Sequence, residues 1–310
     1  MDSVFVDARV KFHRSLPFAK KRRNETFAIM SQLAEKCDLK LFISRHDFYN
    51  KRTRCLKKAW EYKDNRWQIT KKNKVGLCYY HGLTKNINLE VRKISRRINL
   101  PILNNLELER ICDDKFLTHN IFPDLVPKTF LVNDHFEMHR LLHFIKTEKI
   151  VLKPRDGSFG RDVLVIRKRD LTNGIKRNMI IQEFIDSRNF FDIKRPKDMR
   201  LVIINGKVDH AYLRIARPGS YVANMIVGAK KIYLSRDSIP SSVIRRAKVV
   251  DKLFEHYGPR VYTTDFIIDQ SNKPWLVELN SKPGMLFYDG AEKIRNKYFY
   301  NLFNILKSLL

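Results

Sequence analysis

The stretch TTDFIIDQSNKPWLVELNSKPG, residues 263–284, predicts two apolar strands joined by a polar turn. It carries three side chains with oxygen ligands, namely Asp265, Glu278 and Asn280. Glu278 and Asn280 are two residues apart, so on a strand they share one face. Mg²⁺ is usually bound through one or two carboxylates together with nucleotide phosphates. The stretch therefore predicts a magnesium site on a hairpin, with an ordinary amphipathic hairpin that bears solvated acids as the alternative.

The register of this hairpin depends on where its turn closes. A turn over residues 270–273 pairs Asp269 with Pro274 and, by the same count, places Asp265 opposite Glu278. We therefore expect the oxygen-bearing side chains of the two strands to converge on one patch.

The composition of the chain indicates a globular protein. It has 310 residues, of which 44% are hydrophobic, and no run of 18 apolar residues that would predict a membrane span. The N-terminus lacks the apolar segment of a signal peptide. The four cysteines are widely spaced, without a C-x-x-C pair, which argues against a zinc site or a disulfide framework. These features predict a cytoplasmic protein.

The formal net charge of +28 suits nucleic acid, an anionic membrane face or an acidic substrate. The basic residues are spread along the chain, with local clusters at 20–23, 51–58 and 92–97. No familiar nucleic-acid motif accompanies them. This distribution favours a solvated basic surface, and nucleic-acid binding stays as the alternative.

Apolar periodicity predicts an α/β region at the N-terminus, with a helix over 24–36 and strands at 4–10, 39–44, 75–80 and 100–105. Beyond it we expect helices over 113–122, 135–147 and 241–257, and strands at 125–132, 149–154, 163–168 and 179–185. Asn205-Gly206 between alternating apolar runs predicts a hairpin. Ser241 or Ser242 is expected to cap the helix that Gly258 ends. The last twenty residues predict an amphipathic helix docked on the core, with a membrane-surface helix as the alternative.

The segment KPRDGSFGRDV, residues 153–163, lies between two predicted strands. Gly157 and Gly160 permit a tight loop whose backbone N–H groups can face phosphate oxygens. Lys153 at the end of its strand can add a point charge, and Lys115 in the preceding helix is a second candidate cation. The segment is not a Walker A loop, and a plain turn is the alternative.

Two further groups of polar residues follow. The apolar run MIIQEFI, residues 179–185, ends in Gln182 and Glu183, where a strand edge can contact an adenine and an acid can bind ribose hydroxyls. Arg200 and Arg214 flank the Asn205-Gly206 turn and can together clamp a carboxylate or phosphate. The alternatives are a core strand that reaches the surface and a solvated basic face.

The order of these motifs resembles the ATP-grasp superfamily. The string VELNSKPG is similar to the glutathione-synthetase-like and ribosomal-protein glutamate ligase branch. Within that branch the chain looks most like the YheC/YheD family of spore-coat-associated proteins, through AWEYKDNRWQ, VGLCYYHGL, LPILNN and DDKFLTHNIFPDLVPKTF. The resemblance extends over roughly residues 25–290 and is densest from 113 to 284.

The resemblance implies an α+β ATP-grasp fold in which two subdomains clamp ATP. The ATP-grasp domain would span residues 106–310, with a nucleotide-clamping part over 106–190 and a metal and substrate part over 191–310. A small α/β domain over residues 1–105 would precede it.

The resemblance also implies a role for each matching residue. The nucleotide would be held by Lys115, Lys153, Gly157, Ser158, Gly160, Gln182, Glu183 and Ile185. Mg²⁺, or Mn²⁺ in its place, would be held by Asp265, Glu278 and Asn280. Arg214 and Asn224 would steady the transferred phosphate, and Arg200 would bind a substrate carboxylate.

The implied activity is an ATP- and Mg²⁺-dependent carboxylate–amine ligase that forms an amide through an acyl-phosphate. Its substrates would be a small-molecule or peptide carboxylate and an amine, and a homo-oligomer would not be unusual. Asp162, Ala229 and Met285 depart from the family pattern, which bears on rate and substrate. The alternatives are a catalytically weak, ATP-binding coat-associated protein and a basic nucleic-acid-binding protein.

Overall fold

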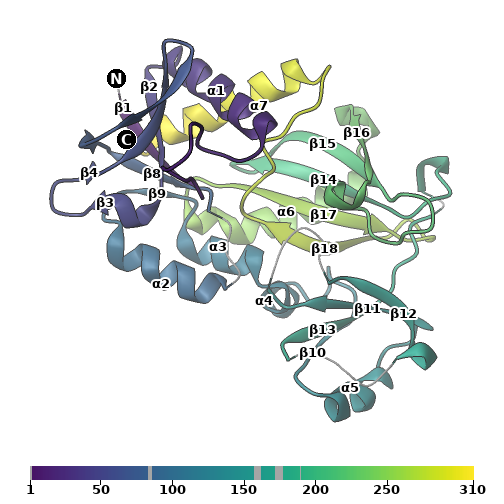
Figure 1. Cartoon of the computed structure of the whole chain (residues 1–310). Helices are drawn as coiled ribbons and strands as arrows, with labels where there is room; N and C mark the ends of the chain where they lie inside the picture. The colour runs from purple at the N-terminus through teal and green to yellow at the C-terminus, as the bar shows by residue number, and fades with distance from the viewer. Residues whose placement is uncertain (1, 83–85, 157–161, 172–176, 189) are drawn as a thin grey trace.

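The computed structural model describes residues 2–82, 86–156, 162–171, 177–188 and 190–310. Three larger sheets and a small one form its framework (Figure 1). The first sheet is built from the N-terminal part of the chain, and the second and third sheets follow in sequence order. No helix in these described ranges is long and apolar enough to cross a membrane.

The first sheet has the strand order β6-β5-β2-β1-β8-β9. Its strands are β1 (Asp2–Asp7), β2 (Leu39–Ser44), β5 (Ala59–Lys63), β6 (Arg66–Thr70), β8 (Leu77–Tyr80) and β9 (Ile102–Leu103). Strands β2, β1, β8 and β9 run parallel, whereas β5 and β6 form an antiparallel hairpin at one edge. The small sheet beside it contains β3 (Tyr49–Asn50), β4 (Cys55–Leu56) and β7 (Asn73–Lys74).

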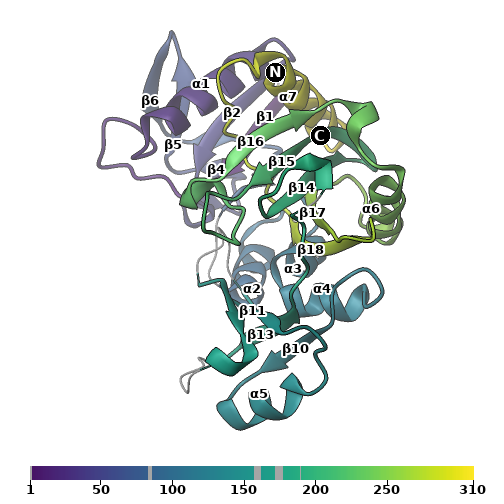
Figure 2. The ribbon, with the colours of Figure 1, turned by 90° about the vertical axis from the view of Figure 1, so that its right-hand side faces the viewer.

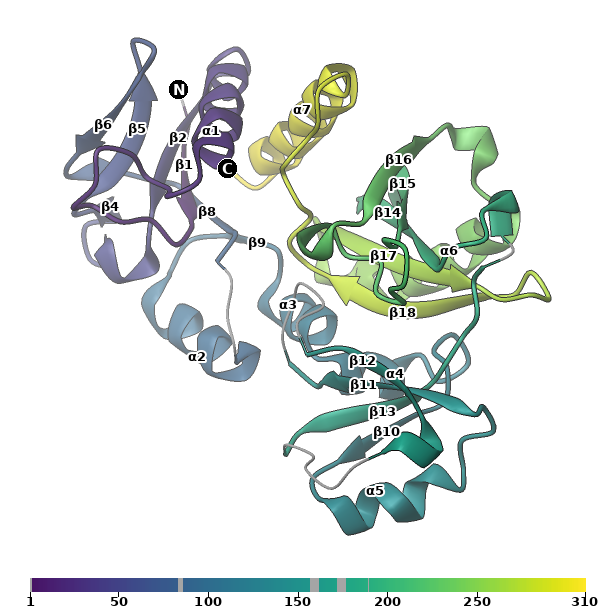
Figure 3. The ribbon, with the colours of Figure 1, turned by 45° about the vertical axis from the view of Figure 1, so that its right-hand side comes forward.

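Helices cover both faces of the first sheet. On one face α1 (Lys21–Glu35) and α7 (Glu292–Ser308) share a core with β1 and β2, and on the other α2 (Ile87–Arg97) packs through Ile94. Phe299, Leu302, Phe303 and Leu306 of α7 are fully buried, with the spacing of one helix face. The last helix is therefore docked on the core, as predicted, and lies beside α1 (Figure 3).

The second sheet has the antiparallel order β10-β13-β11-β12. Its strands are β10 (Thr129–Val132), β11 (Lys149–Pro154), β12 (Leu164–Arg167) and β13 (Met179–Glu183). Helices α3 (Leu106–Asp113) and α4 (Lys115–Ile121) precede it, and α5 (His135–Leu142) covers one of its faces. The predicted helix over 135–147 ends at Leu142, because the Lys146 N–H donates to Glu183 Oε1 of β13 instead of continuing the helix.

The third sheet has the order β16-β15-β14-β17-β18. Its strands are β14 (Lys197–Ile204), β15 (Lys207–Ile215), β16 (Lys230–Leu234), β17 (Val261–Ile268) and β18 (Pro274–Asn280). One face packs on α6 (Ser241–Phe254), and the opposite face carries the polar side chains described below. Short 3₁₀ turns occur at η1 (His46–Phe48), η2 (Lys168–Asp170), η3 (Phe190–Asp192), η4 (Met225–Val227), η5 (Arg236–Ser238) and η6 (Glu255–Tyr257).

Local sequence signals account for the turns of the third sheet. Asn205 and Gly206 both have positive φ, at 44° and 77°, and close the predicted β14–β15 hairpin. Gly258, with φ of 78°, ends the α6–η6 segment as predicted. The predicted serine cap of α6 is wrong: Pro240 occupies the N-cap position, and no side chain caps the helix.

The register of the β17–β18 hairpin is predicted only in part. Asp265 is the partner of Glu278, as predicted, but Pro274 pairs with Ile268 and not with Asp269. Between the pairs Asp265–Glu278 and Phe266–Leu276 the register shifts, because β18 carries one extra residue, Val277, and the predicted pairing holds only on the site side of this shift.

The second and third sheets face one another, and the cavity described below lies between them (Figure 2). Strand β11 of the second sheet contacts β18 of the third through Lys153 Nζ, which donates to the Val277 carbonyl over 3.2 Å. The chain returns from β18 to the first sheet through α7, so its C-terminal helix packs with the N-terminal elements. The domain limits predicted at residues 105 and 190 stay predictions.

Candidate active site

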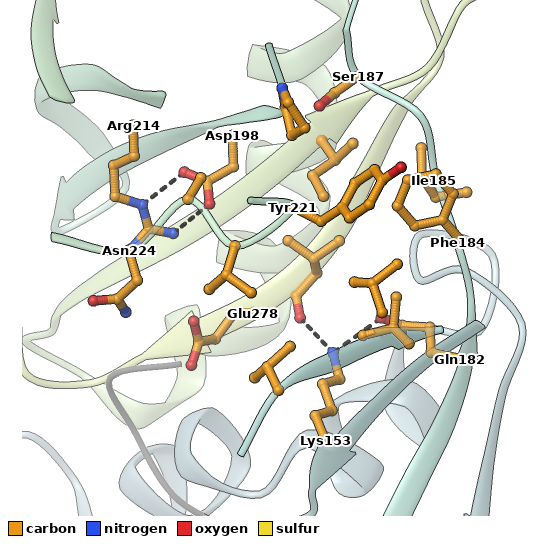
Figure 4. A pocket seen from close by; sticks show the side chains of 18 of the residues that line it. Lys153, Gln182, Phe184, Ile185, Ser187, Asp198, Arg214, Tyr221, Asn224 and Glu278 are labelled. Carbon is orange, nitrogen blue, oxygen red and sulfur yellow. Dashed lines mark hydrogen bonds and ion pairs between the residues drawn. The ribbon is translucent and has the colours of Figure 1, made fainter. Parts of the chain in front are cut away.

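A cavity of about 160 Å³ lies between the second and third sheets (Figure 4). It is lined from the second sheet by β11, β12 and β13, and from the third by β14, β15, β17 and β18. Eight of the residues predicted for the site line it: Lys115, Lys153, Gln182, Glu183, Ile185, Arg214, Asn224 and Glu278. The two sheets therefore bring together most of the predicted residues, which are spread from Lys115 to Glu278 in the sequence.

Lys153 reaches into the cavity from the end of β11. Its side chain is buried, and its Nζ donates to Gln182 Oε1 over 2.9 Å and to the Val277 carbonyl over 3.2 Å. Both acceptors are neutral, and an ammonium has three N–H donors, so one donor is left for a ligand. Burial lowers the pKa of Lys153 to about 8, the nearby Lys115 acts in the same direction, and the charge of Glu278 offsets them only in part. An anion bound in the cavity would therefore stabilise the charged form of Lys153.

The end of β13 forms the wall of the cavity opposite the third sheet. The Gln182 amide is occupied on both sides, because its Nε2 donates to Thr129 Oγ1 over 2.7 Å while its oxygen accepts from Lys153. Glu183 Oε1 accepts from the Lys146 N–H over 3.0 Å. Val151, Val165 and Ile185 add apolar surface to this wall, and Ile267 and Val277 face it from the third sheet. An apolar slot with a few polar groups suits a flat ring such as a nucleobase.

Buried arginines and carboxylates form a network on the third sheet. Arg214 donates from Nε and Nη2 to Asp198 over 2.6 and 2.7 Å, and from Nη2 to Asp265 Oδ2 over 2.6 Å. Arg200 donates from Nε to Asp265 Oδ1 over 2.5 Å and from Nη2 to Asp265 Oδ2. The Arg200 Nη2 atom is also 3.9 Å from Glu278 Oε2. Asp265 therefore holds both arginines in place.

Electrostatics keep this network charged. Burial alone would raise the pKa of Asp265, but the guanidinium groups of Arg200 and Arg214 outweigh it and lower the pKa. Burial would likewise lower the pKa of Arg214, yet Asp198 and Asp265 raise it well above its ordinary value. Arg214 is thus a fixed cation whose position is set by two carboxylates.

The three predicted metal ligands lie in different surroundings. Glu278 lines the cavity with a partly exposed carboxylate, whereas Asp265 is fully buried and both its oxygens accept from arginine. Asn280 is the partner of Thr263, and its Oδ1 accepts from the Lys282 N–H over 2.8 Å. Among the described residues, no group of three or more His, Cys, Asp and Glu side chains is placed to hold a metal. The donors that fit Mg²⁺ here are therefore the carboxylate of Glu278 and the amide oxygen of Asn280, which keeps a second lone pair.

Some predicted residues lie elsewhere. Arg200, Asp265 and Asn280 are not part of the cavity lining, although they adjoin it through the network and β18. Gly157, Ser158 and Gly160 lie outside the described residues. Asp162, which follows them, is exposed with a left-handed φ of 59°. The roles assigned to all these residues stay predictions.

Tyr221 and Lys197 are among the lining residues that were not predicted from the sequence. Tyr221 packs edge-on against Phe184 at 5.3 Å and accepts from Lys149 Nζ over 2.6 Å, which closes one end of the cavity (Figure 4). Lys197 is buried, with Nζ donating to the carbonyls of Ser187 and Ile193 over 2.5 and 2.7 Å. Burial lowers the pKa of Lys197 to about 8. Neither residue stands in a recognisable motif, because loop contacts place both of them.

The loop that follows β18 is anchored by another buried lysine, Lys282. Lys282 Nζ forms ion pairs with Glu109 and, over 2.9 Å, with Asp113 of α3. Asn104 donates from Nδ2 to the carbonyls of Val261 and Ser281, each over 2.8 Å. We call these residues, Asn104, Glu109, Asp113, Ser281 and Lys282, the α3–β18 anchor. It fixes the end of the strand that carries Glu278 and Asn280.

Curated relatives match about half of the chain. A probable alpha-L-glutamate ligase of Shewanella pealeana is 27% identical over 176 residues, which are 54% of this chain and 36% of that protein. A probable alpha-L-glutamate ligase of Legionella pneumophila (strain Corby) is 28% identical over 178 residues, 55% of this chain and 54% of that protein. The glutathione synthetase of Buchnera aphidicola is 30% identical over 139 residues, 42% of this chain and 41% of that protein. The chain thus spans about a third to a half of these relatives.

Solved structures share the fold over nearly the whole chain. An ATP-grasp ligase from Chryseobacterium gregarium, in complex with ADP and a leader and core peptide, has a TM-score of 0.61 at 15% identity, covering 99% of this chain and 97% of that one. D-alanyl-alanine synthetase A from Vibrio cholerae has a TM-score of 0.62 at 13% identity, covering 99% and 98%. At such identities the likeness shows the fold alone, and the predicted α+β ATP-grasp fold is confirmed.

The family model of the RimK-like ATP-grasp domain matches residues 112–296, which is more than half of the 310 residues. The matched segment contains the second and third sheets and the cavity between them. This chain belongs to the RimK-like ATP-grasp family.

Proposed function

We propose that the chain is an ATP- and Mg²⁺-dependent carboxylate–amine ligase that releases ADP and phosphate. The observation that carries the proposal is the cavity between the two sheets. It combines a buried lysine that forms no direct ion pair with a carboxylate among the described residues, a fixed arginine and a partly exposed glutamate whose charge acts on that lysine. Curated relatives named as alpha-L-glutamate ligases and a glutathione synthetase support the same class of reaction.

The nucleotide is proposed to lie with its base in the apolar slot at the end of β13 and its phosphates toward Lys153 and Glu278. Lys153 supplies a charge-assisted hydrogen bond to a phosphate oxygen, and Lys115 lines the same cavity. Phe184 and Tyr221 border the slot with aromatic surface. The structurally similar ATP-grasp ligase from Chryseobacterium gregarium, solved in complex with ADP, supports this choice of ligand.

The proposed metal position is Glu278 and Asn280 at the end of β18. A Mg²⁺ ion held there would neutralise part of the charge on the nucleotide phosphates. Asp265 contributes through the arginines that it orients, and its assignment as a direct ligand stays a prediction. Mn²⁺ in place of Mg²⁺ is likewise a prediction.

In this reaction the protein positions the substrates and stabilises charge, and no side chain forms a covalent bond with a substrate. A carboxylate oxygen of the acid attacks the γ-phosphorus, and ADP leaves with the electrons of the broken P–O bond. The amine nitrogen then attacks the carbonyl carbon of the acyl-phosphate, and inorganic phosphate leaves. Arg214 and Lys153 lie on opposite sides of the cavity, where they can stabilise negative charge in both steps (Figure 4).

The substrates are proposed by class only. The names of the curated relatives favour glutamate or a glutamyl peptide as one partner, and complexes with peptides in the structural neighbours support a peptide as the other. A closer kinship with the YheC/YheD proteins, a cytoplasmic location and a homo-oligomeric state stay predictions.

The proposal is tested by ADP release with Mg-ATP and the twenty amino acids, alone and in pairs. Glu278→Ala should lower turnover by about 100-fold or more, because a group that stabilises charge in the transition state is removed. Glu35→Ala, which changes an exposed acid at the end of α1, is the matched control and should leave turnover unchanged. Unchanged turnover in Glu278→Ala would remove the metal assignment. ATP binding without ADP release from any pair would favour the alternative of a nucleotide-binding protein with little catalysis.

A further inference from the structure

A second cavity lies beside the nucleotide cavity, on the other side of Arg214. It has a volume of about 400 Å³, and Met225, Lys231, Tyr233, Tyr288 and Asp289 are among its lining residues. Lys231 of β16 is the cross-strand partner of Arg214 on β15, and Arg214 lines the nucleotide cavity.

Two residues that are consecutive in the sequence also line the two different cavities. Asn224 lines the nucleotide cavity, and Met225 lines the second one. Strands β15 and β16 lie side by side at the edge of the third sheet (Figure 3). The second cavity therefore opens next to the position proposed for the transferred phosphate.

Aromatic rings surround the amine of Lys231. Its Nζ donates to Tyr233 Oη over 3.0 Å and lies 3.9 Å from the ring centroid of Tyr212 and 4.7 Å from that of Tyr233. The rings of Phe287 and Tyr288 follow at 5.8 and 5.9 Å. The side chain is partly buried, so the amine is sheltered and still borders the cavity.

The charges that face Lys231 are positive. They come from three elements: Arg200 of β14, Arg214 of β15 and Arg22 of α1. Among the described residues no ion pair to a carboxylate is recorded for Lys231, although Asp289 lines the same cavity. His210, whose pKa is lowered chiefly by burial, is the remaining titratable neighbour beyond the tyrosines.

These surroundings determine how readily the amine of Lys231 loses its proton. Burial lowers the pKa of Lys231 to about 7, and the three arginines act in the same direction. The aromatic rings oppose this shift, because a cation over a ring gains about 0.5–2 kcal/mol. The amine can thus take up and release a proton near neutral pH, which is the property required of a general base.

We propose that the second cavity admits the amine substrate and that Lys231 accepts the proton which this amine loses on acylation. The inference rests on the proposed ligase function. The free amine nitrogen attacks the acyl-phosphate carbonyl carbon, the C–N bond forms, and the C–O bond to phosphate breaks with its electrons on the leaving phosphate. One proton of the attacking nitrogen passes to Lys231 Nζ, which returns it to water.

A fixed cation that merely binds an anionic group is the competing role for Lys231, and Lys231→Arg separates the two. Arginine keeps the charge but does not lose its proton in proteins. Arginine would therefore take over the role of a binding cation, but it would not take over the role of a general base. Lys231→Met, which removes both charge and base, serves as the second variant in case the arginine is too large.

The experiment measures product formation from Mg-ATP and the twenty amino acids, with either a second amino acid or hydroxylamine as the nucleophile. Hydroxylamine is already a free nucleophile at pH 7 and reports acyl-phosphate formation as hydroxamate. In Lys231→Arg, amide formation should fall by about 100-fold or more while hydroxamate formation stays within a few-fold of wild type. The wild-type amide rate should rise with pH through about 7, and this rise should be absent from the variant.

Two results would overturn the role of Lys231 while leaving the ligase function in place. One is an amide rate in Lys231→Arg close to that of wild type, and the other is an equal loss of amide and hydroxamate. A wild-type protein that makes neither product would contradict the ligase function itself, and with it the role of Lys231. Lys248→Arg, at an exposed position of α6 that lines neither cavity, is the matched control and should change neither rate.

A second readout needs no substrate. Acetic anhydride at pH 7 labels lysines in their neutral form, and mass spectrometry compares Lys231 with Lys230 in the same molecule. Lys231 should be labelled about tenfold faster or more, because each pKa unit changes the neutral fraction tenfold. Labelling of Lys231 no faster than that of Lys230 would overturn its role as a base, whatever the activity assay shows.

Discussion

The nucleotide cavity and the α3–β18 anchor each contain a buried lysine, and the two lysines are balanced in opposite ways. Lys282 forms ion pairs with Glu109 and Asp113, and these carboxylates raise its pKa although burial acts to lower it. Lys153 donates only to neutral oxygens in the described structure, and burial lowers its pKa to about 8. A buried lysine whose charge is balanced by the protein holds the fold together. Lys153, whose burial is only partly offset by the nearby charge of Glu278, is suited to bind an anionic ligand.

The strongest test of this contrast is Lys282→Met. Removal of one partner leaves Glu109 buried without its counter-charge, which should lower the free energy of unfolding by about 3–5 kcal/mol. Urea denaturation at pH 7 measures the change. Lys248→Met on the exposed face of α6 is the control and should cost little. A loss below about 1 kcal/mol, typical of a surface ion pair, would show that the anchor does not stabilise the fold.

Lys153→Met should have little effect on stability and a large effect on ATP binding, in contrast to Lys282→Met. The free energy of unfolding should change by only about 1 kcal/mol, since the lost hydrogen bonds are offset by removal of an unbalanced charge. Affinity for Mg-ATP should fall about 10- to 100-fold, the value of a charge-assisted hydrogen bond. Isothermal titration calorimetry measures the affinity, with Lys248→Met again as the control. A variant that unfolds readily but binds ATP as wild type does would contradict the comparison.

The pH dependence of ATP binding also tests the contrast between Lys153 and Lys282, and its expected effect is smaller. Because phosphate binds the charged form of Lys153, affinity should decline as pH rises through about 8, by at most about tenfold per unit. Lys153→Arg should flatten this decline, since arginine keeps its proton. Lys197 has a similarly lowered pKa in the same cavity, so Lys197→Arg serves as a second comparison. A wild-type affinity that does not change between pH 7 and 9 would count against a role for either lysine.

Local signals in the sequence predicted much of the scaffold. The strands over 39–44 and 149–154 have the predicted limits, and Asn205-Gly206 closes the predicted hairpin. Periodicity identified α1 and α7 because each buries one face against a neighbour. Such features depend on residues close together in sequence, which is why the sequence alone predicts them.

Long-range pairing was harder to predict. The extra residue in β18, Val277, moved the partner of Pro274 from Asp269 to Ile268, and nothing in the sequence marks its position. Asp265 was expected as a metal ligand, but two arginines from β14 and β15 occupy its oxygens once the strands align. Tyr221 and Lys197 reach the cavity through loop contacts that no local pattern specifies.

The most direct test of the account is the thermal unfolding of wild type and Lys153→Met, with and without Mg-ATP. Nucleotide at 100 times its dissociation constant should stabilise wild type by about 2.7 kcal/mol, a shift that is readily measured. At the same nucleotide concentration the variant should show a clearly smaller shift, since its affinity is reduced. A wild-type protein that Mg-ATP does not stabilise, or a variant stabilised to the same extent, would contradict the assignment of this cavity to ATP.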